Sequence, residues 1–445
     1  MSKKVKLSAL LAGAAIAPWL LAMAGLPSAA QEVFGVTSVI NLVFPPGTPT
    51  QSLGSFDIGF VDPASGLYLL ADRTNKSIDV VDTSNNTLKT QFMPGFVGVV
   101  PAASCSTGGA NDCAGPDGVL VANGNQVWVG DGNSRVWVLD LATGLPIVGS
   151  GSPISTALPG TTDQTRADEL CHDANDGIIL VANDASEPHP FVTFISSTDF
   201  SVLGHIVMDG QEGRPDAAGG IEQCQWSPKT GKFYLNVPNP ASNPNDGVVL
   251  KIDPVSRKIE DTFSLAGSGC GGNAGMALGP FPQILLGCSN AGPNSLIINA
   301  NSGSIIGTLR DESGSDEAWF NPGDNHYFLG SGNHKSPSGN NDPILGVVDA
   351  TGKKPDFSPK SAVGSHSVAA DPVKNQVYVP INNNPAQGGA SGICGANGGD
   401  NSKGCIAVFT DTSGTDATCL AQGAPVTGMS DGEPQFLKAN CPPSQ

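Results

Sequence analysis

Four short segments of this chain share one pattern, and each leads into an apolar run. In each segment an ionisable residue stands six positions before a proline. The pairs are Asp57 and Pro63, Glu222 and Pro228, Asp316 and Pro322, and His366 and Pro372. Because the proline follows Asp, Ser or Asn, each segment is predicted to end in a tight turn between two strands. A hairpin that recurs with fixed spacing is the mark of a repeat architecture.

The unit that contains this hairpin recurs along most of the chain. It combines an inner strand, a turn, a second strand that ends in Asp or Asn, a loop, and a third strand that ends in Asp. Seven second strands are predicted, over residues 67–72, 127–131, 178–183, 232–236, 284–287, 327–330 and 377–380. Short apolar strands that alternate with Gly, Asn, Asp, Ser and Pro predict an all-β fold. We expect a seven-bladed β-propeller, with six or eight blades as open alternatives, in which Val36 to Val43 supplies the strand that closes the ring.

The two ends of the chain differ from the repeats. Lys3, Lys4 and Lys6 precede an apolar run, and small residues follow at Ser28 to Ala30. This pattern predicts a signal peptide over residues 1–30, with an uncleaved membrane anchor as the alternative. No later segment has the roughly 18 apolar residues that a membrane span needs. We therefore expect a propeller over 31–411 and a tail over 412–445, in a periplasmic or secreted protein.

Ten cysteines in an exported chain predict disulfide bonds. Near neighbours suggest the pairs Cys105 with Cys113, Cys270 with Cys288, Cys394 with Cys405, and Cys419 with Cys441. Cys171 and Cys224 then remain, on the inner strands of successive units. A metal-thiolate site is disfavoured because the chain contains no CxxC motif.

The formal net charge of −18 limits the partners of the protein. Nucleic acid binding needs clustered Lys and Arg, so it is not expected. The acidic balance agrees with a protein that holds cations, and it agrees equally with an acidic surface that keeps the protein in solution.

The repeated ionisable residue is predicted to stand at one rim of the central channel. A looser alignment of the remaining units adds three residues to the proline-anchored set, so that the candidate metal ligands are Asp57, Asp117, Asp168, Glu222, Asn273 and Asp316. Glu169 and Glu317 are adjacent alternatives, because a shift of one residue turns a side chain to the other face of a strand. Carboxylate and amide oxygens suit a hard divalent cation, with Ca²⁺ favoured over Mg²⁺. The alternative is that these groups accept hydrogen bonds from turns and line a channel filled with water.

Two histidines are candidates for proton transfer. His366 belongs to the repeated position, and His172 lies close to Asp168 in the sequence. The neighbouring Cys171 is expected to form a disulfide, and no G-x-S-x-G motif for a serine nucleophile is present.

Several blade ends resemble a known repeat. The stretches Val80 to Asn86, Leu139 to Gly144 and Val348 to Gly352 read VVDTSNN, LDLATG and VDATG, and Leu180 to Asn183 reads LVAN. These stretches resemble exported propellers of the YVTN type. More loosely, the chain is similar to lactonase and gluconolactonase-like propellers, in which acidic and amide side chains hold a divalent cation in the channel. The resemblance implies an architecture, and a fold shared by many functions implies an activity only by analogy.

Two functions follow as expectations. The first is a divalent-metal-dependent hydrolase of the lactonase or esterase type, acting on a small-molecule substrate in the channel, with the metal supplying a polarised carbonyl and an activated water. The second is a non-catalytic binding module that uses its loop rim to hold a periplasmic or extracellular protein or a glycan.

Overall fold

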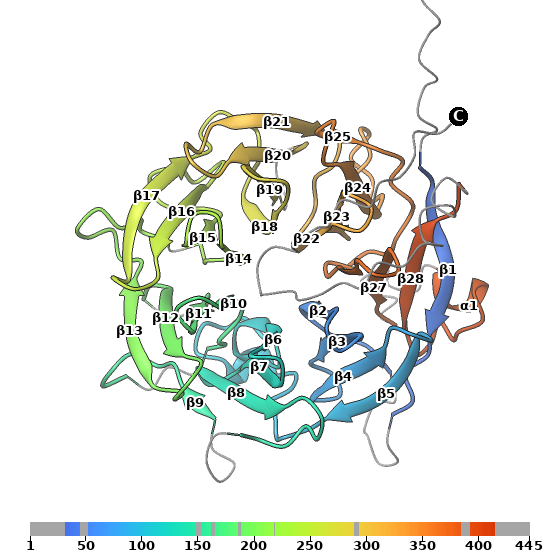
Figure 1. Ribbon diagram of the computed structural model, residues 1–445, viewed down its shortest axis with the longest axis horizontal. Helices are drawn as coiled ribbons and strands as arrows, with labels where there is room; N and C mark the ends of the chain where they lie inside the picture. Colours follow the sequence, from blue (N-terminus) through green and yellow to red (C-terminus); the bar gives the residue numbers. More distant parts are fainter. Residues whose placement is uncertain are drawn as a thin grey trace, which may run out of the picture.

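The computed structural model describes residues 32–44, 52–147, 153–161, 165–185, 188–217, 219–288, 293–383 and 392–413. Within these ranges the chain forms seven four-stranded antiparallel sheets, arranged as blades around a central axis (Figure 1). This arrangement is a seven-bladed β-propeller, so the predicted fold class is confirmed, with seven blades and not six or eight. The predicted signal peptide and all but the first two residues of the predicted tail lie outside the described residues.

Blades 1 to 6 each use four consecutive strands, from the channel outward. The strands of blades 1 to 3 are β2 (Gly59–Asp62), β3 (Leu67–Asp72), β4 (Ser77–Asp82) and β5 (Thr87–Phe92); β6 (Val119–Ala122), β7 (Gln126–Asp131), β8 (Arg135–Asp140) and β9 (Ile154–Ser155); and β10 (Leu170–Asp173), β11 (Ile178–Asn183), β12 (Phe191–Ser196) and β13 (Val202–Val207). The strands of blades 4 to 6 are β14 (Cys224–Ser227), β15 (Lys232–Val237), β16 (Val248–Asp253) and β17 (Lys258–Ser264); β18 (Asn273–Leu278), β19 (Gln283–Cys288), β20 (Asn294–Asn299) and β21 (Ile305–Arg310); and β22 (Ala318–Asn321), β23 (His326–Ser331), β24 (Ile344–Asp349) and β25 (Lys354–Pro355).

Blade 7 joins the two ends of the described chain. It contains β26 (Ala369–Asp371), β27 (Gln376–Ile381), β28 (Cys405–Asp411) and, as its outer strand, β1 (Phe34–Ile40). The strand β1 runs antiparallel to β28, with Phe34 opposite Asp411 and Ile40 opposite Ile406. The predicted closing strand is therefore confirmed, although it begins and ends a few residues earlier than expected.

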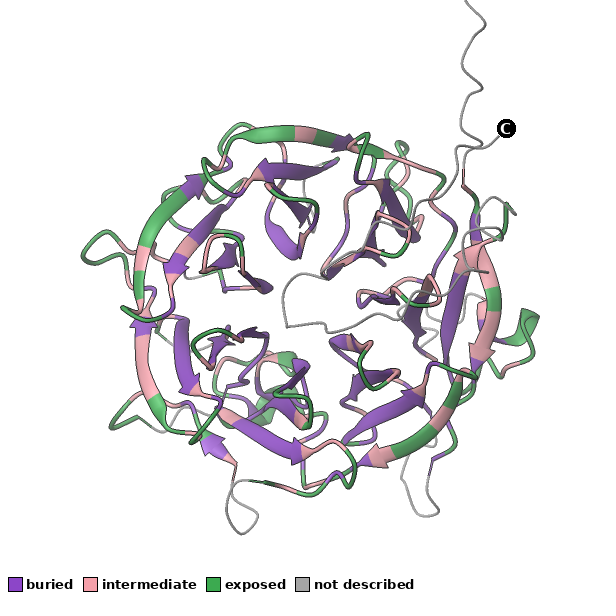
Figure 2. Ribbon diagram, in the orientation of Figure 1, coloured by how far each residue is buried: buried purple, intermediate pink, exposed green. Residues whose placement is uncertain are grey.

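The core lies between neighbouring blades. All six residues of β3, β11, β19 and β23 are buried, whereas the outer strands β5, β17 and β21 are mostly exposed (Figure 2). Apolar side chains on both faces of the middle strands are thus covered by the next blade on each side, which is how a propeller buries sheets that could not be stable alone. At the junction of blades 7 and 1, the rings of Tyr68 and Tyr378 stack with centroids 4.8 Å apart.

Four disulfide bonds link described cysteines, and all four match predicted pairs. They join Cys105 to Cys113, Cys171 to Cys224, Cys270 to Cys288, and Cys394 to Cys405. The bond between Cys171 and Cys224 ties the inner strands of blades 3 and 4 together. The predicted pair Cys419 with Cys441 lies outside the described residues.

Helices are short and occur in the loops. They are η1 (Ala102–Ser104), η2 (Asn111–Cys113) and α1 (Ile393–Ala396). No helix in the described ranges has the length and hydropathy to cross a membrane. The segment with η1 and η2 matters for the channel, because it carries Asn111 and Asp112 toward the first inner strands.

Candidate functional site

The repeated ionisable residue has the same backbone environment in five blades. Each stands two positions before an inner strand, and its N–H donates to a carbonyl of the second strand. The N–O distances are 2.9 Å for Asp57, 2.9 Å for Asp117, 2.8 Å for Asp168, 3.0 Å for Glu222 and 3.4 Å for Asp316. The hairpin geometry thus brings residues from distant parts of the sequence to one end of the channel, as the repeat predicted.

The inner strands of neighbouring blades pack closely at the level of these residues. A Cβ atom on Gly118 would collide with the carbonyl oxygen of Asp168, and one on Gly330 would collide with that of His366. Glycine at these two positions lets neighbouring blades approach at the level of the ionisable residues.

These side chains surround a polar cavity of about 1000 Å³ at this end of the channel. Of the predicted residues, five line it: Asp57, Asp168, Glu222, Asp316 and His366. Glu169, the adjacent alternative, lines it as well. Asp117 lies behind this surface and is fully buried. We call this region the polar end of the channel.

Asn273 does not belong to this set, which corrects the looser alignment in blade 5. Its amide donates to Asn236 Oδ1 at 2.6 Å and to the Val248 carbonyl at 2.9 Å, so it joins blades 4 and 5. The pairing of β18 with β19 is irregular between Asn273 and Met276. Ala274, which stands six residues before Pro280, occupies the equivalent position, so blade 5 contributes no ionisable group to the polar end.

Two arginines supply most of the positive charge at the polar end. Arg73, which follows β3, is 3 % exposed and forms ion pairs with both Asp57 and Asp117. Its Nη1 also donates to Asn111 Oδ1 at 2.5 Å. Nothing in the sequence pattern singled out Arg73, because it lies outside the repeated hairpin position.

Arg166 plays the matching role beside blade 3. Its Nε donates to Asp168 Oδ2 at 2.5 Å and its Nη2 to Asp184 Oδ2 at 2.7 Å. In the structure its guanidinium is engaged by carboxylates.

His366 extends the network on the side of blade 7. Its Nε2 lies 3.2 Å from Asp57 Oδ1, its Nδ1 lies 2.8 Å from the Gly364 carbonyl, and its ring stacks on Phe56 with centroids 5.0 Å apart. Burial lowers the pKa of His366, but the hydrogen bond to Asp57 and the charges of Asp316 and Asp57 outweigh burial and raise the pKa to about 9. The imidazole is therefore protonated at neutral pH and acts as a hydrogen-bond donor to Asp57.

The carboxyl groups at the polar end divide into one with a lowered pKa, Asp57, and others with raised pKa values. Burial would raise the pKa of Asp57, but Arg73 and His366 outweigh it and hold the pKa below its ordinary value. Burial raises the pKa of Asp168 to about 7 despite the opposing charge of Arg166. Burial, together with neighbouring carboxylates, also raises the pKa of Glu169 and of Glu222 well above the ordinary value.

Glu222 and Asp316 differ from the paired aspartates. Both are half-buried, line the cavity, and accept no hydrogen bond from any described residue. Burial raises the pKa of Asp316, and the Asp316 charge in turn raises the pKa of Glu222. Like the buried Glu169, which also lines the cavity, they have coordination capacity left over.

The fit of a divalent cation differs between the two sets of carboxylates. Oxygens of Asp57, Asp117 and Asp168 lie within 4.8 Å of one another, which is close enough for one ion. However, Arg73 and Arg166 already bind these oxygens, so a dication there would lie against two guanidinium groups. Glu222 and Asp316 offer oxygen ligands that neither guanidinium binds, although Arg166 acts on both carboxylates at longer range and His366 acts on Asp316. The donor type suits Ca²⁺ or Mg²⁺.

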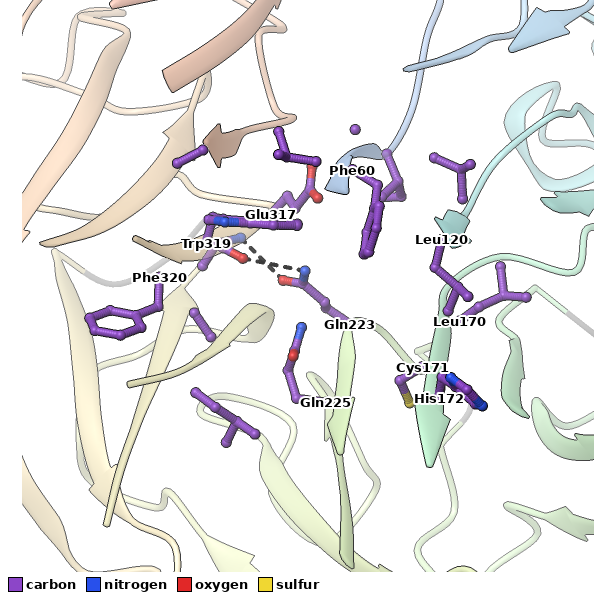
Figure 3. A pocket seen from close by; sticks show the side chains of 18 of the residues that line it. Phe60, Leu120, Leu170, Cys171, His172, Gln223, Gln225, Glu317, Trp319 and Phe320 are labelled. Carbon is purple, nitrogen blue, oxygen red and sulfur yellow. Dashed lines mark hydrogen bonds between the residues drawn. The ribbon is translucent and has the colours of Figure 1, made fainter. Parts of the chain in front are cut away.

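A second cavity, of about 200 Å³, occupies the other part of the channel, where the inner strands continue. Its walls include Phe60, Leu120, Leu170 and Trp319, so we call it the apolar end of the channel (Figure 3). Ile58 and Glu169 line both cavities and mark the boundary between them. No feature of the sequence pointed to this cavity, because its residues read as ordinary strand residues.

His172 lies at the apolar end, on β10, and not beside His366. The structure therefore does not bring the two candidate catalytic histidines together. The physical reason is that His172 lies four residues beyond Asp168, and four residues of extended strand move it along the channel wall.

Comparison with known proteins supports the β-propeller fold but assigns the chain to no family. No protein-family model matches the sequence, and no curated protein matches it. A chain in the crystal structure of the mitotic checkpoint complex is similar in structure, with a TM-score of 0.53 and 14 % sequence identity. The match covers 84 % of this chain and 95 % of that chain. At this identity the likeness extends to the β-propeller fold alone.

Proposed function

We propose that this protein is an exported β-propeller that binds a small polar molecule at the polar end of its channel, with a divalent cation held by Glu222 and Asp316. One observation carries the proposal: two half-buried carboxyl groups line the cavity, have raised pKa values and accept no hydrogen bond from described residues. Four disulfide bonds among the described cysteines support export, because such bonds persist in oxidising compartments.

Ca²⁺ fits this proposal better than Mg²⁺. Ca²⁺ accepts irregular sets of carboxylate, amide and water oxygens, whereas Mg²⁺ demands a near-ideal octahedron. Carboxyl groups whose charged forms are disfavoured by burial and by one another gain a compensating charge when a cation binds. Ca²⁺ binding should therefore lower the pKa values of Glu222 and Asp316 and release protons at any pH at which either group is protonated.

Hydrolysis of an ester or a lactone is the reaction that this arrangement supports best. A bound cation would polarise a carbonyl group and lower the pKa of a bound water. His366, whose two ring nitrogens already contact Asp57 and the Gly364 carbonyl, would contribute positive charge near an oxygen that gains negative charge. Asp168, with a pKa of about 7, can take up or release a proton in the working range. The loose resemblance to lactonase-like propellers favours the same reaction class.

Calorimetric titration of chelator-treated protein with CaCl₂ tests the cation site. We expect one saturable event with proton release, and a rise in Tm on Ca²⁺ addition. The variant Glu222→Gln/Asp316→Asn should lose both effects while its circular dichroism stays unchanged. Glu212→Gln, whose side chain is 83 % exposed far from the channel, serves as the matched control and should keep both effects. Equal Ca²⁺ binding by wild type and the double variant would refute the assignment.

A non-catalytic module for a glycan is the second candidate, and a separate observation favours it. Four asparagines from loops line the mouth of the polar cavity: Asn111, Asn333, Asn341 and Asn382. Amides are well suited to sugar hydroxyls because each offers two donors and an acceptor. Binding to immobilised glycans that survives in Glu222→Gln/Asp316→Asn but is lost in Asn333→Ala/Asn341→Ala would favour this function over the first.

A further inference from the structure

The apolar end of the channel has the composition of a ligand site. Its walls are mainly apolar and aromatic, and a few polar side chains reach the same space. Phe60 and Trp319 come from blades 1 and 6 and meet edge to face, with ring centroids 5.5 Å apart (Figure 3). Both are half-buried, so parts of the two rings face the cavity and not the packed core. Leu120 and Leu170, from blades 2 and 3, also line the cavity, and Phe60 packs against the cluster that contains them.

One buried polar atom at this cavity has an unused bonding capacity. Glu317 is 1 % exposed, and its Oε2 accepts hydrogen bonds from Ser367 Oγ at 2.6 Å and from the Val368 N–H at 3.0 Å. Its Oε1 has no hydrogen-bond partner among the described residues. Leaving such an atom unpaired is costly, so it marks a place where a ligand or a water belongs.

The neighbouring Gln223 shows that unpaired buried polar atoms are not a general property of the channel. Its side chain is buried and both of its polar atoms are paired: Oε1 accepts from the N–H groups of Met276 and Ala318, and Nε2 donates to the Ala318 carbonyl. Gln223 therefore fastens blade 4 to blades 5 and 6. Gln225, two residues along the same strand, is half-buried at the cavity and forms no such bonds with described residues.

We propose that the apolar end is a second binding site, which takes a small aromatic alcohol with its ring against Trp319 and Phe60 and its hydroxyl on Glu317 Oε1. The cavity volume of about 200 Å³ fits a single substituted ring, because an apolar cavity of about 150 Å³ in another protein holds benzene. A hydroxyl both donates and accepts a hydrogen bond, so it satisfies Glu317 in either protonation state. This proposal does not depend on the cation site at the polar end.

Calorimetric titration with 4-methylphenol, and with toluene as the analogue without a hydroxyl, tests this site on the full chain. We expect one saturable site for 4-methylphenol, with an affinity about tenfold higher than for toluene, the effect of one hydrogen bond to a buried group. Glu317→Gln should keep a preference for 4-methylphenol, because its amide N–H can donate to the hydroxyl while its oxygen accepts from Ser367 and Val368, whereas Glu317→Met should abolish the preference. Absence of saturable binding in wild type, or equal affinity for the two probes, would overturn the proposal.

A cavity-filling variant tests the location independently. Gln225→Trp places a bulky ring in the cavity from a half-buried position, and it should weaken 4-methylphenol binding at least tenfold. Gln211→Trp, on an exposed loop outside both channel cavities, is the matched control and should bind as wild type. Circular dichroism and Tm establish that both variants fold. Undiminished binding in folded Gln225→Trp would overturn the location, as would loss of binding in Glu222→Gln/Asp316→Asn.

Discussion

The two ends of the channel are built from the same seven hairpins but differ in nearly every physical property. The polar end encloses about 1000 Å³ among carboxylates, two arginines and a histidine, whereas the apolar end encloses about 200 Å³ among aromatic and aliphatic side chains. The change takes place over three residues at the start of an inner strand, from Asp57 to Phe60 in blade 1 and from Asp316 to Trp319 in blade 6. Position along the inner strand, and not the choice of blade, thus decides the chemistry of the channel.

The difference also shows how each end is stabilised. Charged groups at the polar end compensate one another through Arg73 and Arg166, so loss of one partner leaves buried charge behind. Packing at the apolar end is held by contacts between rings and by the covalent link between Cys171 and Cys224. Substitutions at the two ends should therefore differ in size and in pH dependence.

The largest effect is expected for Arg73→Met. The substitution leaves Asp57 and Asp117 buried without their shared cation, which costs about 3–5 kcal/mol of unfolding free energy. Urea denaturation followed by circular dichroism measures the loss. Arg214→Met, which removes a guanidinium paired with Asp209 and Glu212 at the protein surface, is the control and should change stability little. Similar small losses in both variants would show that the polar end does not depend on Arg73.

The next effect concerns the two disulfides closest to the channel. Replacing Cys171 and Cys224 by Ala removes a disulfide between residues 53 positions apart in the sequence. Replacing Cys105 and Cys113 by Ala removes a disulfide between residues 8 positions apart. Chain entropy predicts losses of about 4 and about 2.5 kcal/mol, respectively. The short loop carries Asn111 and Asp112, which contact the two arginines, so its variant should weaken Ca²⁺ binding and leave 4-methylphenol binding intact. The reverse pattern of ligand effects would contradict the division between the ends.

Smaller effects should appear in the pH dependence of stability, where one group from each end, His366 and Glu317, can be followed. Burial opposes the protonated form of His366, but Asp57 and Asp316 raise its pKa to about 9. The protonated imidazole therefore stabilises the folded state fully below pH 6.5, and this contribution is lost as pH rises through 9. Burial raises the pKa of Glu317 to about 8. The native state therefore keeps this proton while the unfolded chain loses it, and stability falls as pH rises from about 4.5 to 8.

Urea midpoints measured from pH 4 to 10 distinguish the two windows. His366→Asn should flatten the profile between pH 6.5 and 9, and Glu317→Gln should flatten it between pH 4.5 and 8. Outside the shared range of pH 6.5–8, each variant should leave the other group's window as in wild type. Identical profiles for wild type and His366→Asn would show that the imidazole does not stabilise the polar end by its charge.

Much of the fold follows from the sequence because the repeat is locally encoded. The proline turns fix the register of four hairpins, and the residues six positions earlier consequently meet in space. Three of the observed disulfide pairs were predicted because their cysteines lie near each other in the sequence. The pair Cys171 with Cys224 was predicted because both lie on inner strands of successive blades. The alignment failed at Asn273, where Gly271 and Gly272 precede an irregular pairing of β18 with β19 and no ionisable residue marks the register.

The electrostatics of the site were harder to predict. The repeated position predicted a ring of carboxylates, but Arg73 lies outside that position. Only the packed structure shows that Arg73 joins Asp57 to Asp117. The apolar end was missed for a different reason. Phe60 and Trp319 have the pattern of core residues, and whether a ring fills a core or borders a cavity depends on the distance between blades, which no local pattern encodes.

The closing strand has a mechanical consequence. Phe34 at the start of β1 and Asp411 at the end of β28 lie opposite each other, so the chain leaves the closed ring from both sides at the same point. Tension applied across these two exits would load the hydrogen bonds between β1 and β28 one after another, as in a zipper, and not all together in shear. Blade 7 is thus the place where a stretched molecule should open first, and single-molecule pulling through Phe34 and Asp411 should require less force than pulling across any blade closed by consecutive strands.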